Sequence, residues 1–221
     1  MRRSTLAVLT GIALLIGGCT GSRTSRSQFV DPQFATRVAP PQRSTLPAVS
    51  PVQDRLSVPA GWLPPGGITS RWTDIIIHHS ATATGGARAF DQHHRVDNGW
   101  DELGYHFVIG NGTDSADGAI EVGPRWIKQK HGAHCKTQDN YYNDHGIGIC
   151  LVGDFTQGSP SPAQLASLVK LLCFLTSECG IPAERVCGHG GVTHRTACPG
   201  HKFPLAAVRQ QILQAGVLSK R

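Results

Sequence analysis

Histidine and cysteine are the residues of this sequence whose side chains are best suited to chemistry. All 11 histidines lie beyond residue 77, and the chain also holds seven cysteines. The close Cys-x-x-Cys pairs of a structural zinc site are absent, so a metal site would need ligands from distant segments. The candidate histidines and cysteines are scattered over more than a hundred residues, and two imidazoles and one thiolate from such segments could form a three-ligand set. A set of this kind leaves one tetrahedral position open, which is typical of catalytic zinc.

The elements that must bring these segments together are short strands interspersed with helices. Apolar runs predict strands over residues 74–78, 104–110, 119–122 and 146–155. Helices are predicted over residues 90–96, 162–179 and 204–213. The helix over 162–179 has the clearest signals, because Ser161 and Gln164 form a capping box and Gly180 ends it. This mixture predicts an α/β domain in which helices cover a central β-sheet.

The first 60 residues have the composition of an export signal followed by a tether. Residues 1–19 have two arginines directly after Met1 and continue in an apolar stretch that is too short to span a membrane. The stretch ends in Ile-Gly-Gly-Cys19, which resembles the lipobox of bacterial lipoproteins and predicts lipidation of Cys19. An ordinary signal peptide and an uncleaved helix are the alternatives. Residues 20–60 are rich in Ser, Pro and Arg and predict a disordered tether, and residues 61–221 are the predicted folded domain.

The charge of the chain does not indicate a nucleic-acid partner. The net charge is +6, and many of the arginines lie in the first 55 residues. Little positive charge is left for the basic face that nucleic-acid binding requires. A mildly cationic protein would still be attracted to an anionic polymer such as a cell wall.

Several segments of the predicted domain together resemble a known family. They are Ile-Ile-His78-His, Gly-Tyr105-His-Phe, Gly-Ala-His134, Gly-His189-Gly and Thr-Ala-Cys198-Pro. In order and approximate spacing they resemble the zinc-dependent N-acetylmuramoyl-L-alanine amidase fold, which is shared by some phage lysozymes and the peptidoglycan recognition proteins. The resemblance covers residues 72–199 and implies a central mixed β-sheet flanked by helices.

The resemblance implies one zinc ion held by His78, His189 and Cys198. The spacing from His189 to Cys198 is one residue longer than is usual in the family. We place the extra residue in a loop among residues 193–195, where an insertion is easily absorbed. His194 is therefore a second choice of ligand. Peptidoglycan is the implied partner, and we expect a monomer.

The resemblance also implies the residues that act on the substrate. Tyr105 and Thr196 match catalytic positions, and His134 and Asn143 match residues that contact the substrate in the cleft. The implied reaction is hydrolysis of the amide bond between N-acetylmuramic acid and L-alanine. Tyr105 would position or polarise the water or the carbonyl, because an ordinary tyrosine, with a pKa of about 10, is not an obvious base. His134 or Thr196 would help to stabilise the oxyanion.

Other functions are compatible with the same resemblance. Non-catalytic recognition proteins of the family bind peptidoglycan but typically lack the zinc cysteine, so Cys198 favours an enzyme. A branch that hydrolyses small anhydro-muropeptides tends to have aspartate in place of Cys198. A wall-anchoring lipoprotein with a degenerate domain is the third alternative.

The remaining histidines, acids and cysteines suggest structural roles. His79 is expected to be structural, and His93, His94 and His145 are expected at the surface or behind the site. Asp101 and Glu102 are expected to cap or solvate a turn. The cysteines indicate an oxidising compartment, with a Cys179–Cys187 disulfide as one option. Together with Cys19 they predict the cell envelope, with an anchor on the periplasmic face of the outer membrane because Thr20, rather than Asp, follows Cys19.

Overall fold

The computed structural model describes residues 58–218. The predicted signal segment, Cys19 and nearly all of the predicted tether lie outside the described residues. Within residues 58–218, no helix is both long and apolar enough to cross a membrane.

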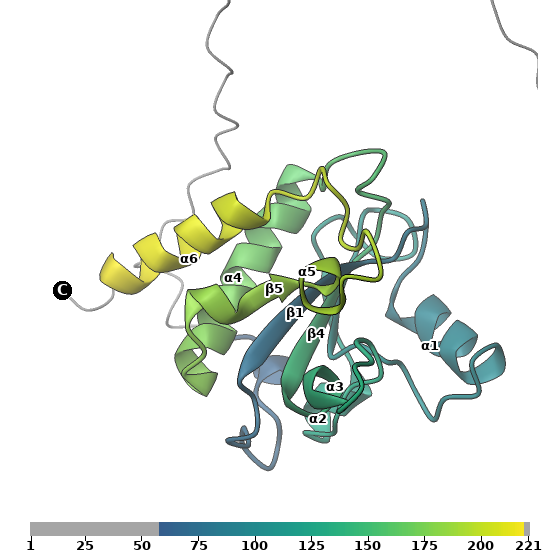
Figure 1. Ribbon diagram of the computed structural model, residues 1–221, viewed down its shortest axis with the longest axis horizontal. Coiled ribbons are helices and arrows are strands. Elements are labelled where there is room, and N and C mark those ends of the chain that lie inside the picture. The colour runs from purple at the N-terminus through teal and green to yellow at the C-terminus, as the bar shows by residue number, and fades with distance from the viewer. Residues whose placement is uncertain (1–57, 219–221) are drawn as a thin grey trace, which may run out of the picture. The chain divides into compact units, whose positions relative to one another are not determined.

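A five-stranded mixed sheet forms the centre of the described domain (Figure 1). Its strands, in spatial order, are β3 (Ile120–Val122), β2 (Phe107–Ile109), β4 (Gly146–Leu151), β1 (Asp74–His79) and β5 (Val186–Gly188). β3 runs antiparallel to β2, whereas the four strands β2, β4, β1 and β5 run parallel to one another. The predicted α/β class with a central mixed sheet is therefore confirmed.

Two predicted strands are longer than the strands in the structure. The apolar run over 104–110 forms a strand only over β2, because Gly104 and Tyr105 belong to a loop that packs on Ala133. The run over 146–155 ends as a strand at Leu151, and Gly153 then adopts a φ of 145° in the turn that follows. β5 was not predicted, since its three residues are too few to show an alternating pattern.

Three longer helices accompany the sheet. They are α1 (Ala87–Val96), α4 (Pro162–Cys179) and α6 (Leu205–Leu218). The capping box of α4 is present as predicted, and Gly180 ends this helix in the left-handed conformation with a φ of 68°. The short helices are η2 (Ala60–Trp62), α2 (Pro124–Ile127), α3 (Tyr141–His145), η3 (Ala183–Arg185) and α5 (His189–Thr193).

The two faces of the sheet have different roles. Alternate residues of a strand point to opposite faces, and Ile75, Ile77 and Ile149 pack with residues of α4 and α6 in the main hydrophobic core. Figure 1 shows α4 and α6 together, with α1 well away from them. His78 and Cys150, which are paired in register between β1 and β4, lie one residue further along their strands and face the other way. The sheet therefore keeps its chemistry-bearing residues on the face opposite the main core.

Candidate metal centre and active site

Two neighbouring parallel strands bring His78 and His189 together. Ile77 of β1 pairs in register with Gly188 of β5, so the residue after each of them is placed at the same edge. The centroids of the two imidazole rings are 4.6 Å apart. His78 is buried and His189 is half-buried.

Cys198 reaches the two histidines through a loop that packs closely on glycines. The Gly190 N–H donates to the Cys198 carbonyl oxygen (2.6 Å), and the His79 N–H donates to Cys198 Sγ (3.4 Å). A Cβ atom on Gly190 would lie 2.3 Å from the Thr196 carbonyl oxygen, and one on Gly188 would lie 2.8 Å from Pro199 Cδ. The Gly-His-Gly segment is therefore required for the approach of the cysteine.

The ligand atoms of His78, His189 and Cys198 lie within 4.8 Å of one another, and no other group of three potential ligands is found in residues 58–218. Cys198 Sγ is 3.7 Å from His78 Nδ1. Two ligands at ordinary Zn–N and Zn–S distances and a tetrahedral angle would be roughly 3.6 Å apart. The donor set therefore fits one zinc ion with a fourth position left open. His194 is exposed and is not part of the group.

The protonation states of the ligands agree with this fit. Burial and the neighbouring histidines hold the pKa of His78 well below its ordinary value, so its ring is neutral, as a ligand must be. Burial raises the pKa of Cys198 to about 11. A buried thiolate is therefore unfavourable here unless a cation accompanies it.

Tyr105 lies beside the cluster, two residues before the start of β2. Its ring centroid is 5.2 Å from that of His78. Burial, followed by the nearby thiols of Cys150 and Cys198, raises the pKa of Tyr105 well above its ordinary value. The hydroxyl therefore stays protonated at neutral pH and can donate a hydrogen bond, but it cannot act as a general base.

The structure places His134 next to His78, where both of its ring nitrogens have partners within the protein, and its expected contact with the substrate stays a prediction. His134 Nε2 is 3.2 Å from the Gly146 carbonyl oxygen, which can only accept, so this nitrogen carries the proton. His134 Nδ1 therefore accepts from His78 Nε2–H at 3.1 Å. This bond leaves His78 Nδ1 without a proton and facing Cys198. His134 thus fixes the tautomer and orientation of His78, as the outer hydrogen-bond partner of a metal-binding histidine does.

Asn143, whose expected contact with the substrate also stays a prediction, makes hydrogen bonds within the protein. Its Oδ1 accepts from the N–H groups of His134 and Cys135, both at 2.8 Å. Its Nδ2 donates to Asn140 Oδ1 at 2.8 Å. The side chain is buried, so Asn143 fixes the turn that carries His134.

Thr196 is exposed next to the cysteine ligand. Its Oγ1 accepts from the Cys198 N–H at 3.1 Å, which orients the cysteine loop. The hydroxyl proton of Thr196 is not used in that bond, so it is available to a ligand.

Several supporting residues were not recognised from the sequence. His106 is fully buried, accepts from the Gly148 N–H (2.9 Å) and lies next to the Lys130 carbonyl (3.1 Å). His94 is buried and accepts from the Gly104 N–H (3.0 Å), which places it behind the Tyr105 segment. His106 lies in a predicted strand and His94 was expected at the surface or behind the site, but the backbone groups that these two rings contact are distant in the sequence.

The turn that holds Asp101 and Glu102 differs from the expectation. Glu102 is 3% exposed and pairs with Lys128 (2.6 Å), so it is not a solvated turn residue. Asp101 is half exposed and pairs with Arg125, which is itself 1% exposed. The charges in this turn are therefore part of the packed structure.

Among the described residues, Cys135, Cys150, Cys179, Cys187 and Cys198 are free thiols. Cys179 and Cys187 are among them, so the Cys179–Cys187 disulfide that the sequence left open is not formed.

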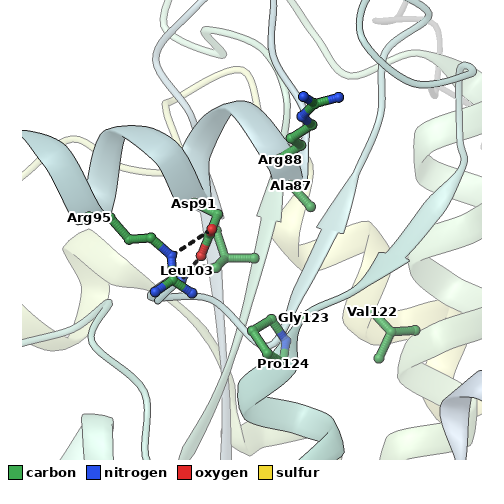
Figure 2. Close-up of a pocket in the computed structure, with 8 residues that line it drawn as sticks. All are labelled: Ala87, Arg88, Asp91, Arg95, Leu103, Val122, Gly123 and Pro124. Carbon is green, nitrogen blue, oxygen red and sulfur yellow. Dashed lines mark hydrogen bonds and ion pairs between the residues drawn. The ribbon is translucent and has the colours of Figure 1, made fainter. Parts of the chain in front are cut away.

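A separate pocket of about 230 Å³ lies between α1 and the start of α2 (Figure 2). It is lined by residues that include Asp91, Arg95 and Leu103, and none of the three candidate metal ligands lines it. The pocket is therefore distinct from the cluster of His78, His189 and Cys198.

Comparisons with known proteins agree with this geometry. Residues 69–201 match the sequence pattern of the N-acetylmuramoyl-L-alanine amidase family. The chain is 32% identical over 139 residues to peptidoglycan-recognition protein LB of Drosophila melanogaster. The aligned region covers 58% of this chain and 55% of that protein. It is 35% identical over 112 residues to the endolysin of Escherichia phage T7. The aligned region covers 47% of this chain and 66% of the endolysin. The chain thus matches less than two thirds of the length of either relative.

The fold is similar to a solved structure from the same family. N-acetylmuramoyl-L-alanine amidase LysC from Clostridium intestinale superposes with a TM-score of 0.55 and 26% sequence identity. The match covers 71% of this chain and 95% of that chain.

Proposed function

Since residues 69–201 match its pattern, the chain belongs to the N-acetylmuramoyl-L-alanine amidase family, and we propose that it is a zinc-dependent hydrolase of peptidoglycan. The bond cleaved is the amide between N-acetylmuramic acid and L-alanine. The observation that carries this proposal is the His78, His189 and Cys198 cluster, with its ligand atoms within 4.8 Å of one another and the Tyr105 ring beside it.

The side chains around the cluster have separate tasks. His78, His189 and Cys198 would hold the ion, and when bound it supplies Lewis acidity that lowers the pKa of water and polarises a carbonyl. Tyr105 donates its hydroxyl proton in a hydrogen bond to the oxygen on which negative charge develops. Its raised pKa keeps that proton in place at neutral pH.

Thr196 and His134 act at different distances from the reaction. The exposed Thr196 hydroxyl can donate to the substrate while its oxygen holds the Cys198 N–H. His134 keeps the His78 ring in the orientation that a ligand needs, because both of its ring nitrogens are engaged within the protein. We therefore assign oxyanion stabilisation to Tyr105 and Thr196 and not to His134.

A peptidoglycan-binding module without catalysis is the second candidate, because one relative is named as a recognition protein. The complete set of two histidines and a cysteine favours the enzyme. A binding module does not need an open coordination position with a tyrosine hydroxyl next to it.

Digestion of purified peptidoglycan separates the two candidates. The protein is incubated with insoluble peptidoglycan, and the new ends are identified by mass spectrometry. The proposal predicts free L-alanine amino termini and intact glycan strands. Binding to the sediment with no new ends would support the recognition module instead.

We also propose that Cys19 carries a lipid that anchors the protein to a membrane of the cell envelope, with residues 20–60 as the tether. The support is the Ile-Gly-Gly-Cys19 sequence after a short apolar stretch. Cells grown with a labelled fatty acid should label the wild-type protein, and the Cys19→Ser variant should stay unlabelled. An unlabelled wild-type protein in the soluble fraction would refute the anchor and leave the proposed enzyme unaffected.

A further inference from the structure

Arg125 is the most deeply buried charged residue near the proposed active site. It is the second residue of the short helix α2 and is 1% exposed. Its guanidinium donates through Nε to the Leu103 carbonyl (2.7 Å), through Nη1 to the His131 carbonyl (2.8 Å) and through Nη2 to Asp101 Oδ1 (2.5 Å). A buried charge is costly unless it is paired and fully hydrogen-bonded, and here all three nitrogens have a partner.

The carbonyl partners of Arg125 belong to two different segments of the proposed active site. Leu103 is two residues before Tyr105, and His131 is three residues before His134. The two segments run side by side, because the Ala133 N–H donates to the Gly104 carbonyl at 3.0 Å. A Cβ atom on Gly104 would lie 2.6 Å from the Ala133 carbonyl oxygen, so the contact is close.

The Leu103 segment is also fixed from its other side by α1. Asp91 Oδ1 accepts from the Leu103 N–H at 2.6 Å, and Asp91 Oδ2 accepts from Arg95 Nε at 2.8 Å. Figure 2 shows Leu103 beside this Asp91–Arg95 pair. Arg125 therefore joins the Leu103 segment, which α1 holds on one side, to the His131 segment on the other.

We propose that Arg125 is a positioning residue for amide hydrolysis, which fixes the Tyr105 segment against the His134 segment. This inference rests on the proposed function. A planar guanidinium can donate in three fixed directions at once, whereas a lysine ammonium of the same charge is a single point and cannot reach all three acceptors. Arg125→Lys therefore keeps the charge but loses the geometry.

The test measures kcat, KM and zinc content of Arg125→Lys in the full-length protein, with soluble peptidoglycan fragments as substrate. A misplacement near 1 Å can reduce a rate by about 10²-fold, so kcat should fall by about 10- to 100-fold. Zinc content should remain at the wild-type level, and KM should change much less than kcat. Rates are expressed per folded molecule, so that a loss of stability alone does not reduce them.

The matched control is Arg185→Lys. Arg185 also pairs with a buried carboxylate, Asp74 Oδ2 at 2.8 Å, and donates to the Tyr141 hydroxyl at 3.0 Å. Asp74 begins β1, whereas His78 lies near its end. This variant should lower the melting temperature and leave kcat unchanged.

A double-mutant cycle with Tyr105→Phe separates positioning from a general structural role. If Arg125 acts by placing the tyrosine hydroxyl, Arg125→Lys should cost little further kcat once that hydroxyl is removed. An unchanged kcat in Arg125→Lys would overturn the inference, and so would the same fold-loss in both backgrounds. If Arg125→Lys does not fold, Asp101→Asn replaces it in the cycle, with a smaller loss and the same non-additivity expected.

The outcomes also distinguish this inference from the proposed function. A wild-type protein that releases no L-alanine termini refutes the function itself. A wild-type protein that is active, impaired by Tyr105→Phe and indifferent to Arg125→Lys refutes only the role of Arg125.

Discussion

At the scale of single residues, burial decides what each side chain can do. Tyr105 is a proton donor and not a base, because its surroundings raise the pKa of its hydroxyl. His134 is a neutral support, because burial lowers its pKa to about 3 and both ring nitrogens are engaged. The sequence marked both residues as functional, but their individual roles depend on contacts with residues far away in the chain.

Tyr105→Phe tests the role of the hydroxyl. The substitution removes one hydrogen-bond donor and keeps the ring that packs beside His78, so folding and zinc content should stay near wild type. Loss of one donor to a developing oxyanion typically costs about 10²–10³ in rate. We expect kcat to fall in this range with little change in KM, measured on peptidoglycan fragments.

Thr196→Val is the matched variant for the second donor and should show a smaller loss of kcat than Tyr105→Phe, because Thr196 is exposed.

A fully active Tyr105→Phe protein with normal zinc content would show that Tyr105 only packs against the site. The assignment of the oxyanion donor would then be wrong, although the metal cluster would be unaffected.

At the scale of elements, the glycines of β4 create room for the supporting histidine. Gly148 lies on the face of the sheet that carries the site, and a Cβ atom there would be 2.4 Å from Cδ2 of His134. Gly132 lies against the same ring from another segment, and a Cβ atom on Gly132 would be 2.3 Å from Cδ2 of His134. The His134 ring therefore fits between two backbone positions that lack side chains.

Gly148→Ala should weaken zinc binding without touching a ligand. The added methyl group displaces the His134 ring, which then loses its hydrogen bond to His78. Loss of such an outer partner typically lowers metal affinity by about 10- to 100-fold. Competition with a chelator of known affinity measures the change.

Gly191→Ala is the control, because Gly191 lies in α5 between the ligand segments and a Cβ atom there meets nothing within 4 Å. It should bind zinc as the wild type does. Equal affinities for wild type and Gly148→Ala would contradict the supporting role of His134.

The elements with strong local signals could be predicted from the sequence, and those defined by distant contacts could not. The capping box of α4 depends on residues three apart, and the strand β1 on three consecutive isoleucines, so both were found. β5 is three residues long and exists because it pairs with β1. The burial of Arg125 and Glu102 depends on partners in other loops, and a charged residue alone predicts exposure.

The site residues followed the same rule. The resemblance of short segments to a family singled out His78, His189 and Cys198, which the structure brings together. It did not show which groups within the protein Asn143 and His134 contact, because several of these partners are backbone groups. Backbone contacts leave no mark on the side-chain sequence.

At the scale of the whole described domain, one face of the sheet buries apolar side chains and the other buries ionisable ones. The face covered by α4 and α6 is apolar. The other face buries several histidines, and burial lowers the pKa of His94 to about 4 and that of His134 to about 3. These rings are neutral in the folded protein and would gain a proton in the unfolded chain below its ordinary pKa of about 6.5.

The metal-free protein should therefore lose stability in mild acid. Because the unfolded chain binds more protons than the folded protein below about pH 6.5, stability is greatest above that pH and falls as the pH decreases towards 4. Each such histidine contributes up to about 1.4 kcal/mol per pH unit in this window. Urea unfolding at pH 7.5 and pH 5.5 measures the difference, and equal free energies of unfolding would contradict the buried neutral state.

The most direct test of the central claim is a zinc titration of the metal-free protein. Zinc is removed with a chelator and added back in steps, while the release of L-alanine amino termini from peptidoglycan is followed. Activity should be absent without metal, rise in proportion to zinc and level off at about one ion per chain, as expected for a three-ligand catalytic site. Cys198→Ala should show no rise. Full activity of the metal-free protein, or of Cys198→Ala, would contradict the account.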